Sequence, residues 1–582
     1  MYAQDMADQS RVVNLEAKLV DKFTGEIISY ANIFNSNGSR GTISDDSGYF
    51  KLNSLNISDS LTISFIGYKT IKEPVTIFEG LDFIYMETQI DILSDVILLS
   101  DYSFLYDLLA SCKRNISSQS KTSKAYFELE TYINEQQVEQ VECYYNASIR
   151  GYDITDLKFK NGRIAVTDYN NRFFFSTATG EILHKHSLFK KNIGFPQGPL
   201  ELSKNKLKKK YDLSLISNYA DENEKEIYVV KFDPKDPSGN FFSGCIWINR
   251  NDGFIVKINL ESLKSKVYPF VPLFEPERIN GVNLFLTKTY QLNEGQMDLK
   301  SVNFDYDLIY NPDIKRGIDT VQTKSTKAIF VVYDYTRQFE IPYFDFTKEY
   351  LVHNDYRKIS AVPYNSFFWE DMNVFKLSDR QGRIENFYNN SASLTHDKIF
   401  KSNKFSDKGF FEHQYTNWSE KRIFFRNHSS NPMDFEIYDG NIPSARYNLE
   451  AQIYLDINET IDSTHVLSET VFDPFKTFFW YPMDHKGLAF INMYFDIVEI
   501  QRRELEREIG QHKLSIDRIK ELYVERKEKT EQMCQAYFRS VERGNNLKEM
   551  LKWNKYIKDE LHIDNVEIFQ LQSGDMSILL SK

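Results

Sequence analysis

Short strand-like runs alternate with turn residues through the first ninety residues, and this spacing constrains the fold more than any other feature of the chain. Leu15, Ala17 and Leu19 alternate with polar neighbours, which is typical of a strand that buries one face. Further runs follow at intervals of about 8–12 residues, separated by turns that contain glycine and aspartate. This spacing predicts a small β-sandwich.

Three strings carry the pattern of this segment: LVDKFTGEIISYANIF, GTISDDSGYFKL and DSLTISFIGYKT. Their order resembles the carboxypeptidase regulatory-like domain of many exported Bacteroidetes proteins. The residues that match the family pattern are Asp21, Thr24, Gly25, Ala31, Gly41, Thr42, Asp45, Gly48, Phe50, Asp59, Leu61, Ser64, Gly67 and Tyr68. Ile33 and Ser44 replace the usual Val and Thr. The resemblance implies a transthyretin-like sandwich of seven strands over residues 1–95, without peptidase activity.

Acidic residues in the turns of this domain have two interpretations. Asp45 and Asp59 are expected to accept backbone N–H groups in turns. Asp45, Asp46 and Ser47 could instead bind Ca²⁺, but their carboxylates lack the spacing of an EF-hand loop. The structural interpretation is favoured.

A short helix and a linker are expected to follow over residues 96–123. Phe104, Leu105, Leu108 and Leu109 have helical spacing, with Asp101 or Ser103 as the expected N-cap. The stretch that ends this region is rich in Ser, Lys and Gln, which is typical of a linker.

The middle of the chain is expected to be β structure, with an antiparallel β domain over residues 124–325 and an aromatic-rich β region over 326–482. Aromatic residues make up 15% of the chain, and they fit the pleated surface of a sheet. Strand-like runs cover residues 125–132, 226–232, 244–249, 254–260, 282–290, 302–310 and 328–333. Asp252-Gly253 predicts a hairpin turn, because this pair suits positive φ.

Two features of this β-rich middle bear on binding. The string SGCIWINRNDGFIVKINLE is similar to the half-barrels of lipoprotein-carrier proteins, and this resemblance implies an apolar ligand. A solid β core without a cavity is the favoured alternative. The aromatic clusters at residues 367–369 and 478–480 could anchor a partner, although packing in the core is favoured.

The last hundred residues, 483–582, change to a helical period. Ile491, Tyr494, Val498 and Leu505 share one face of a first helix. A second helix is expected over residues 515–541 and a third over 546–561, with breaks near Gly510 and Gly544. We expect a helical hairpin packed on the β body, with a partner-binding or dimerising arm as the alternative. The predicted fold class is therefore mainly β, with a transthyretin-like N-terminal β-sandwich, a large antiparallel β region and a C-terminal α-helical segment.

Charge gives little support for nucleic-acid binding. The formal net charge is −12, so the chain lacks the basic surplus that such proteins carry. A local cluster comprises Lys204, Lys206, Lys208, Lys209 and Lys210. We interpret it as a solvated loop or strand edge, with a phosphate or anionic-lipid site as the less favoured alternative.

Cysteine and histidine patterns indicate neither a metal centre nor a cofactor. Cys112, Cys143, Cys245 and Cys534 include no CxxC pair, which excludes a conventional zinc ribbon or thioredoxin motif. We expect them to be small buried hydrophobes, although an exported protein could pair two of them. His184 and His186 are two residues apart, so both side chains are expected on one face of a strand. An exposed polar face is favoured over a metal-binding pair. His465 precedes Glu469 by four residues without a third ligand.

No catalytic, cofactor-binding or metal residue can be assigned from motifs. Zincin, GxSxG, P-loop and GxGxxG patterns are absent from the sequence. A non-enzyme is therefore expected, although a glycosidase carboxylate pair could be assembled by the fold.

No run of about 18 apolar residues occurs, so no transmembrane helix is expected. The start Met1-Tyr2-Ala3-Gln4-Asp5 resembles what remains at a signal-peptide cleavage site, which predicts export to the periplasm or the outer membrane. The expected function is a non-catalytic envelope protein with a binding or structural role, whose partner is an envelope protein, a lipid or a glycan. The alternatives are a carrier of lipid or another apolar ligand in the central β domain, and an unrecognised hydrolase of glycans or peptides. The sequence does not indicate an oligomeric state.

Overall fold

The computed structural model describes residues 12–29, 31–35, 41–44, 47–65, 68–88, 102–115, 119–167, 169, 176, 179–220, 225–270, 278–293, 295–311, 321–335, 337–345, 358–359, 362–363, 365–372, 392–393, 416–422, 447–459, 463–473, 477–479, 484–511 and 514–571. The chain divides into two compact units. Unit 1 comprises residues 1–339, 353–356 and 368–395, and unit 2 comprises residues 340–352, 357–367 and 396–582.

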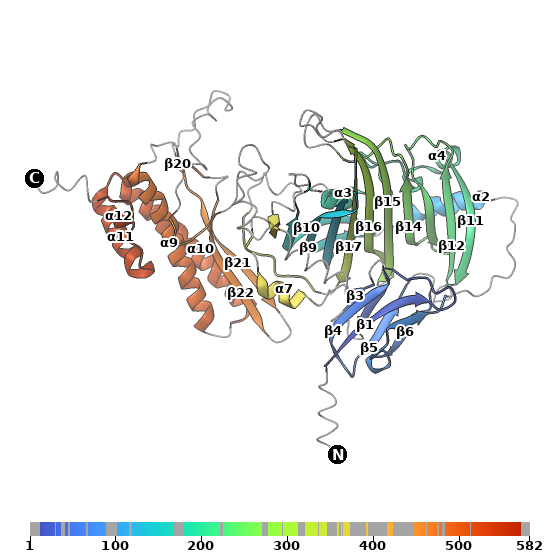
Figure 1. The fold of residues 1–582 in the computed structure, drawn as a ribbon, viewed down its shortest axis with the longest axis horizontal. Coiled ribbons are helices and arrows are strands. Elements are labelled where there is room, and N and C mark those ends of the chain that lie inside the picture. The colour runs from blue at the N-terminus through green and yellow to red at the C-terminus, as the bar shows by residue number, and fades with distance from the viewer. Residues whose placement is uncertain are drawn as a thin grey trace, which may run out of the picture. The chain divides into compact units, whose positions relative to one another are not determined.

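Unit 1 begins with a seven-stranded sandwich, coloured blue in Figure 1. One sheet has the order β4-β1-β7, built from β1 (Val12–Asp21), β4 (Tyr49–Asn56) and β7 (Phe83–Met86). The other has the order β3-β2-β5-β6, built from β2 (Asn32–Asn35), β3 (Gly41–Ile43), β5 (Ser60–Ser64) and β6 (Ile71–Pro74), and a short 3₁₀ turn, η1 (Val75–Ile77), follows. Leu15, Ala17 and Leu19 of β1 pack with Ile33 and Ile63 of the opposite sheet in one core. The predicted N-terminal β-sandwich is confirmed.

An eleven-stranded sheet forms the rest of unit 1, and its long strands β15 and β16 bend along their length (Figure 1). The order is β11-β12-β13-β14-β15-β16-β17-β8-β9-β10-β18, and every pair is antiparallel. The strands are β8 (Lys121–Ile133), β9 (Gln136–Arg150), β10 (Asp153–Val166), β11 (Tyr211–Ala220), β12 (Glu226–Pro234), β13 (Ser243–Asn249), β14 (Ile255–Ser262), β15 (Arg278–Asn293), β16 (Gln296–Asn311), β17 (Gln322–Asp334) and β18 (Ala392–Ser393). Strand β17 runs across residue 325, where the sequence suggested a boundary between two β regions.

The hairpin predicted at Asp252-Gly253 joins β13 to β14. Gly253 has φ +70°, and a Cβ built there would lie 2.8 Å from Ser111 Oγ, so only glycine fits the turn. The register across the sheet then aligns a row of side chains on one face: Ile258, Lys288, Val302, Phe330, Phe127 and Cys143. All members of this row are buried, and Lys288 is the one polar member.

Short helices complete unit 1: α2 (Ser103–Ser111), η2 (Cys112–Asn115), α3 (Thr179–Lys185), η3 (Pro199–Glu201) and α4 (Lys204–Lys210). The expected helix near residue 103 is confirmed, but the N-cap of α2 is Tyr102 and no side chain caps it. The lysine cluster is α4, so the expectation of a loop or strand edge is wrong. Leu207 is buried while the lysines on either side are exposed, because successive residues of a helix point to different sides.

Unit 2 packs helices on a small sheet of order β19-β22-β21. Its strands are β19 (Thr416–Asn417), β21 (Ala451–Glu459) and β22 (Thr464–Phe472), with a second pair, β20 (Tyr447–Asn448) and β23 (Phe478–Phe479). The helices are α9 (His485–Gln511), α10 (Ile516–Val541), η8 (Glu542–Gly544), α11 (Leu547–Leu561) and α12 (Asn565–Ile568). Helix α7 (Ser366–Met372) has its first two residues in unit 2 and the others in unit 1.

The three helices predicted near the C-terminus are confirmed. Ser515 and Asn546 are the N-caps of α10 and α11, and each side chain accepts a backbone N–H of the first turn. The Tyr523 hydroxyl of α10 donates to the Ile453 carbonyl of β21 at 3.0 Å. The helical segment therefore packs on β structure of its own unit.

Candidate functional site

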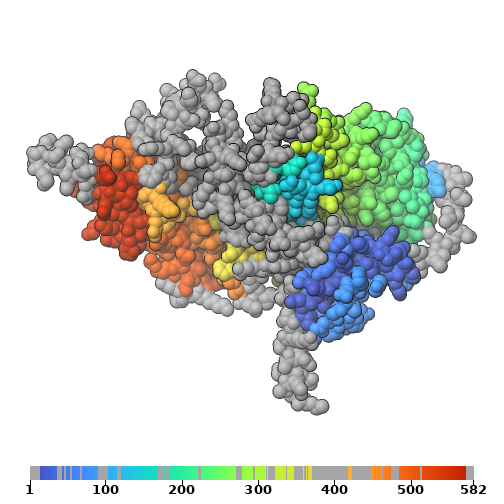
Figure 2. All heavy atoms as spheres, viewed as in Figure 1, coloured from blue at the N-terminus to red at the C-terminus, as the bar shows by residue number. Residues whose placement is uncertain are grey.

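Several large apolar side chains are exposed on the sandwich, and we call four of them the aromatic patch: Phe23, Ile27, Phe83 and Tyr85. Their exposed fractions are 69%, 53%, 48% and 59%. Phe83 and Tyr85 lie on the outward face of β7, two residues apart, while Ile84 and Met86 point into the core. The surface of the sandwich is blue in Figure 2.

Strand register places two of the patch side chains, Ile27 and Tyr85, on either side of one residue of β1. Val20 of β1 pairs with Tyr85 on one side and with Ile27 on the other. Val20 is only 7% exposed, since it lies between these two larger side chains. The patch therefore extends across the outer face of the sheet.

A turn stabilised by Asp21 carries Phe23. One carboxylate oxygen of Asp21 accepts the backbone N–H groups of Phe23 and Thr24, each at 2.7 Å. The N–H of Thr24 and burial act in opposite directions on the pKa of Asp21, and the net effect lowers it. Gly25 closes the turn with φ +71°. Asp21, Thr24 and Gly25 are family-pattern residues, so the family motif holds the loop that presents Phe23.

Gly48 lies close to Ile27 of the patch, and a larger residue does not fit at this position. It has φ +74°, and a Cβ would lie 2.6 Å from Ile27 Cγ2 and 2.7 Å from the Leu19 carbonyl. The sequence did not point to the patch. A signal was present in Phe83-Ile84-Tyr85-Met86, where neither outward position is charged or small.

A group of polar side chains is buried in the large sheet around Lys288. Lys288 is 1% exposed, and its Nζ donates to the His186 carbonyl at 2.6 Å. Burial lowers the pKa of Lys288 to about 8. Among the described residues, His186 Nδ1, Tyr290 Oη and Asp153 Oδ1 have no hydrogen-bond partner. We call these four residues the Lys288 group.

The placement of the two histidines corrects the sequence-based expectation. His184 lies in the last turn of α3, and His186 follows the helix, so they do not share a strand face. His186 is 3% exposed and packs against the ring of Phe195, with centroids 4.9 Å apart. Burial, and then the charge of Lys288, lowers its pKa well below the usual value. The spacing of the two histidines could not reveal the burial of His186, because the residues that pack against it come from distant segments of the chain.

The other face of the large sheet buries two carboxylates under aromatic rings. The Tyr126 hydroxyl lies 2.9 Å from a Glu128 oxygen and 2.8 Å from a Glu142 oxygen. Arg163 Nε donates to Glu142 at 2.5 Å, and its guanidinium lies 4.3 Å from the Trp369 ring centroid. Glu128 and Glu142 are 1% and 3% exposed, so this pair does not line an open cleft.

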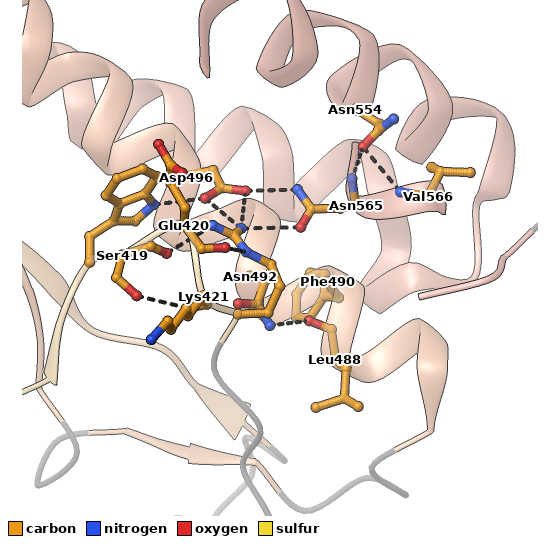
Figure 3. Close-up of polar contacts among 12 residues, drawn as sticks. Ser419, Glu420, Lys421, Leu488, Phe490, Asn492, Asp496, Asn554, Asn565 and Val566 are labelled. Carbon is orange, nitrogen blue, oxygen red and sulfur yellow. Dashed lines mark hydrogen bonds and ion pairs between the residues drawn. The ribbon is translucent and has the colours of Figure 1, made fainter. Parts of the chain in front are cut away.

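Unit 2 contains a buried polar network centred on Asp496 of α9 (Figure 3). The Asp496 carboxylate accepts from Arg422 Nη1 at 2.8 Å, Trp418 Nε1 at 2.8 Å and Asn565 Nδ2 at 2.7 Å. The remaining Arg422 groups donate to the carbonyls of Ser419 and Glu420. Each charge has its partners, so this network joins the 416–422 segment to α9 and α12 and serves the fold.

Other residues considered from the sequence have structural surroundings. Cys112, Cys143 and Cys534 are buried as expected, Cys245 is half-buried, and all four are free thiols. His465 accepts from or donates to Ser463, and its ring stacks on Phe367. Asp59 accepts from the side-chain amide of Asn35. Asp45, Asp46, Gly67 and Trp480, and the other histidines except His485 and His562, lie outside the described residues.

The aromatic cluster at residues 367–369 divides between two roles. Phe368 and Trp369 are buried against the Tyr144 ring, which confirms core packing for these two. Phe367 is 54% exposed. Within the residues that the structure describes, no group of three or more His, Cys, Asp or Glu could hold a metal ion, and no helix is long and apolar enough to cross a membrane.

Comparison with known families identifies the N-terminal domain. Residues 16–98 match the CarboxypepD_reg-like domain family, a range that includes β2 to β7 and most of β1. The sandwich is therefore a domain of this family. No curated protein matches the chain.

Solved structures give distant likenesses. A LolA superfamily protein from Nitrosomonas europaea is 11% identical, with a TM-score of 0.16, and the match covers 43% of this chain and 97% of that one. The MucA/MucB complex of Pseudomonas aeruginosa is 12% identical over 39% of this chain and 92% of that one, with a TM-score of 0.15. At these TM-scores neither likeness supports a statement about this chain.

Proposed function

We propose that this chain is a non-catalytic binding protein of the bacterial envelope, located in the periplasm or at the outer membrane. Its CarboxypepD_reg-like sandwich binds an envelope protein through the aromatic patch. The observation that carries this proposal is the exposure of four large apolar side chains on one small domain: Ile27 and Tyr85 pair with Val20 from its two sides, Phe83 shares the face of β7 with Tyr85, and Phe23 lies in the turn that follows β1.

The sandwich does not need these side chains for its core. Its buried core is formed by residues of both sheets, including Leu19, Ile33 and Ile63, and none of the four patch residues belongs to it. Contiguous exposed apolar surface marks interaction sites in soluble proteins, and aromatic side chains often supply most of the binding free energy. A binding role therefore explains an exposure that folding alone does not.

The carrier alternative finds less support in the large sheet. Its apolar face is partly covered by the chain's own aromatic side chains: Phe195 and Phe270 lie against Phe304 of β16, with ring centroids 6.1 and 6.2 Å away. The hydrolase alternative needs accessible carboxylates, whereas Glu128 and Glu142 lie beneath Phe368 and Trp369. The binding proposal therefore fits the described residues best.

Site-specific photo-crosslinking in the envelope of the producing cell tests the proposal. p-Benzoylphenylalanine replaces Phe23 in the patch or, as a matched control, Phe34, an exposed aromatic residue on the opposite sheet. We expect a discrete protein adduct from position 23 that is absent from position 34. Equal labelling at both positions, or no adduct at position 23, would contradict a binding role of the patch.

A further inference from the structure

We propose that unit 2 has a binding site of its own, a groove between α10 and α11 that receives an acidic amphipathic helix of a partner protein. The two helices are orange-red in Figure 1, and the groove between them, which we call the α10–α11 groove, has a volume of about 500 Å³. The residues that line it are Lys529, Met533, Ala536 and Ser540 of α10 and Glu549, Lys552, Trp553 and Tyr556 of α11. This inference does not rest on the aromatic patch, because the patch belongs to unit 1.

The lining residues recur with the spacing of one helix face. On α10 they are separated by four, three and four residues, and on α11 Glu549, Trp553 and Tyr556 are separated by four and three. The row on α10 extends for about 16 Å, which is three turns of helix. A groove between two such rows accepts the ridge of side chains on a third helix. The arrangement therefore favours a helical occupant over an extended one.

The aromatic side of the groove is fixed before a partner binds. Trp553 Nε1 donates to Ser540 Oγ at 2.9 Å, and the ring of Tyr537 lies 5.5 Å from the Trp553 ring, centroid to centroid. The Tyr556 ring packs edge-on near Trp553, and both rings lie against the core of unit 2. On the α10 side, Ala536 is small and exposed. A fixed aromatic surface opposite a small side chain leaves room for the apolar side chains of a partner and loses little conformational entropy on binding.

The charge beside the start of α11 indicates an acidic partner. Lys548, Lys552 and Lys555 are exposed and lie four and three residues apart, on one side of the helix. Among the described residues, Glu549 is the one carboxylate that pairs with any of these lysines, at 2.5 Å from Lys552 Nζ. Lys552 is still 63% exposed in this pair. Acidic side chains on the occupant would therefore complement this end of the groove.

The other end of the groove lacks this excess of positive charge. Lys529 Nζ lies 3.2 Å from a Glu504 oxygen. Burial, and then the charges of Glu504 and Glu560, raise the pKa of Tyr556 to about 12, so both carboxylates lie near this end. The occupant is therefore a helix with apolar side chains at positions i, i+3, i+4 and i+7 toward the groove and with its acidic side chains beside the start of α11.

Photo-crosslinking of the full chain in the envelope fraction of the producing cell tests the groove. p-Benzoylphenylalanine replaces Ala536, which lines the groove, or, as a matched control, the neighbouring Gln535, which is exposed and does not line it. We expect a discrete protein adduct from position 536 that is absent from position 535. Mass spectrometry of the digested adduct should identify an acidic peptide whose apolar residues have helical spacing.

Reversal of one charge tests the complementarity. Lys552→Glu, in the chain with the photoreactive residue at position 536, should lower the adduct yield about tenfold. Lys421→Glu changes the net charge equally at an exposed lysine of unit 2 that does not line the groove, and it should leave the yield unchanged. Thermal melting compares the folds of the two variants. A rise in ionic strength from about 0.05 to 0.5 M should lower the yield of the chain that keeps Lys552, which tests the same charge without a substitution.

A missing adduct at position 536, equal adducts at positions 535 and 536, or a yield that responds neither to Lys552→Glu nor to salt would overturn the proposal. An adduct with a lipid, with a second copy of this chain or with a peptide that lacks acidic residues would overturn the assignment of the occupant. The adduct at position 23 is measured separately, so its absence contradicts the proposed function and not the α10–α11 groove.

Discussion

The Asp496 network of unit 2 and the Lys288 group of the large sheet both bury charge, but they do so in opposite ways. Asp496 is fully buried and accepts hydrogen bonds from an arginine, a tryptophan and an asparagine. Lys288 is buried in an apolar row, and the one hydrogen-bond acceptor that the described residues offer it is a backbone carbonyl. The difference teaches that paired charges stabilise one arrangement of the fold, whereas an isolated charge costs free energy until it is neutralised.

The pKa of Lys288 shows that cost directly. Burial lowers it to about 8, whereas a lysine in the unfolded chain keeps a value near 10.5. Between these two pH values the unfolded chain binds more protons than the folded chain, so stability rises as pH rises. The nearby carboxylate of Asp153 acts in the opposite direction but is the smaller influence.

The largest effect is expected from breaking the paired network. Asp496→Ala leaves the Arg422 guanidinium buried without its carboxylate, so the free energy of unfolding of unit 2 should fall by about 3–5 kcal/mol. Urea unfolding of the full chain measures this loss, in the transition in which the C-terminal helices unfold. Glu506→Ala is the matched control: Glu506 is an exposed partner of Arg502, and its removal should change stability by less than about 1 kcal/mol. A similar small change for Asp496→Ala would show that the network contributes little.

A second test neutralises the isolated charge. The free energy of unfolding of unit 1 in the wild-type chain should rise by up to about 3 kcal/mol between pH 8 and pH 10.5. In this range Lys288 has lost its proton in the folded chain but keeps it in the unfolded chain. Lys288→Met should remove the part of this gain that comes from Lys288, leave the part from Lys300, whose pKa burial also lowers to about 8, and be more stable than the wild type at pH 7. Urea midpoints of both chains across this range provide the measurement, and parallel pH profiles would refute an isolated buried ammonium.

Tyr126 provides an intermediate case within unit 1, because one hydroxyl lies between two buried carboxylates. Tyr126→Phe leaves Glu128 and Glu142 without that hydroxyl and should lower the free energy of unfolding by about 1–2 kcal/mol. Tyr49→Phe is the control, since its hydroxyl bonds to the exposed carboxylate of Glu16. Equal losses from both substitutions would show that burial does not increase the contribution of this hydroxyl.

The smallest stability effect is expected on the aromatic patch. Phe83→Ser combined with Tyr85→Ser should change the free energy of unfolding by less than about 1 kcal/mol, because both rings are about half exposed. The same variant should lose the position-23 adduct. Thermal melting and photo-crosslinking of one preparation test both statements, and a large loss of stability would assign the rings to folding instead of binding.

Local patterns were sufficient where neighbours in the sequence determine the structure. The caps Ser515 and Asn546 mark two helix starts, and Asp252-Gly253 marks a hairpin, since each signal acts within a few residues. Local patterns failed at His186, which alternation placed on an exposed strand face, and at the lysine cluster of α4. In both cases a short helix replaced the expected extended chain.

The sequence by itself determined the class of the fold: short, regularly spaced runs that form a sandwich, long alternating runs that form an antiparallel sheet, and a helical C-terminal segment. Only the tertiary structure decided which apolar side chains are exposed and which charges are paired. Tyr85 and Ile27 meet across Val20, and Asp496 meets Arg422, through strand pairing and helix packing between residues far apart in the chain. Period and propensity describe which side of an element a residue occupies, whereas exposure depends on what the rest of the chain places against that side.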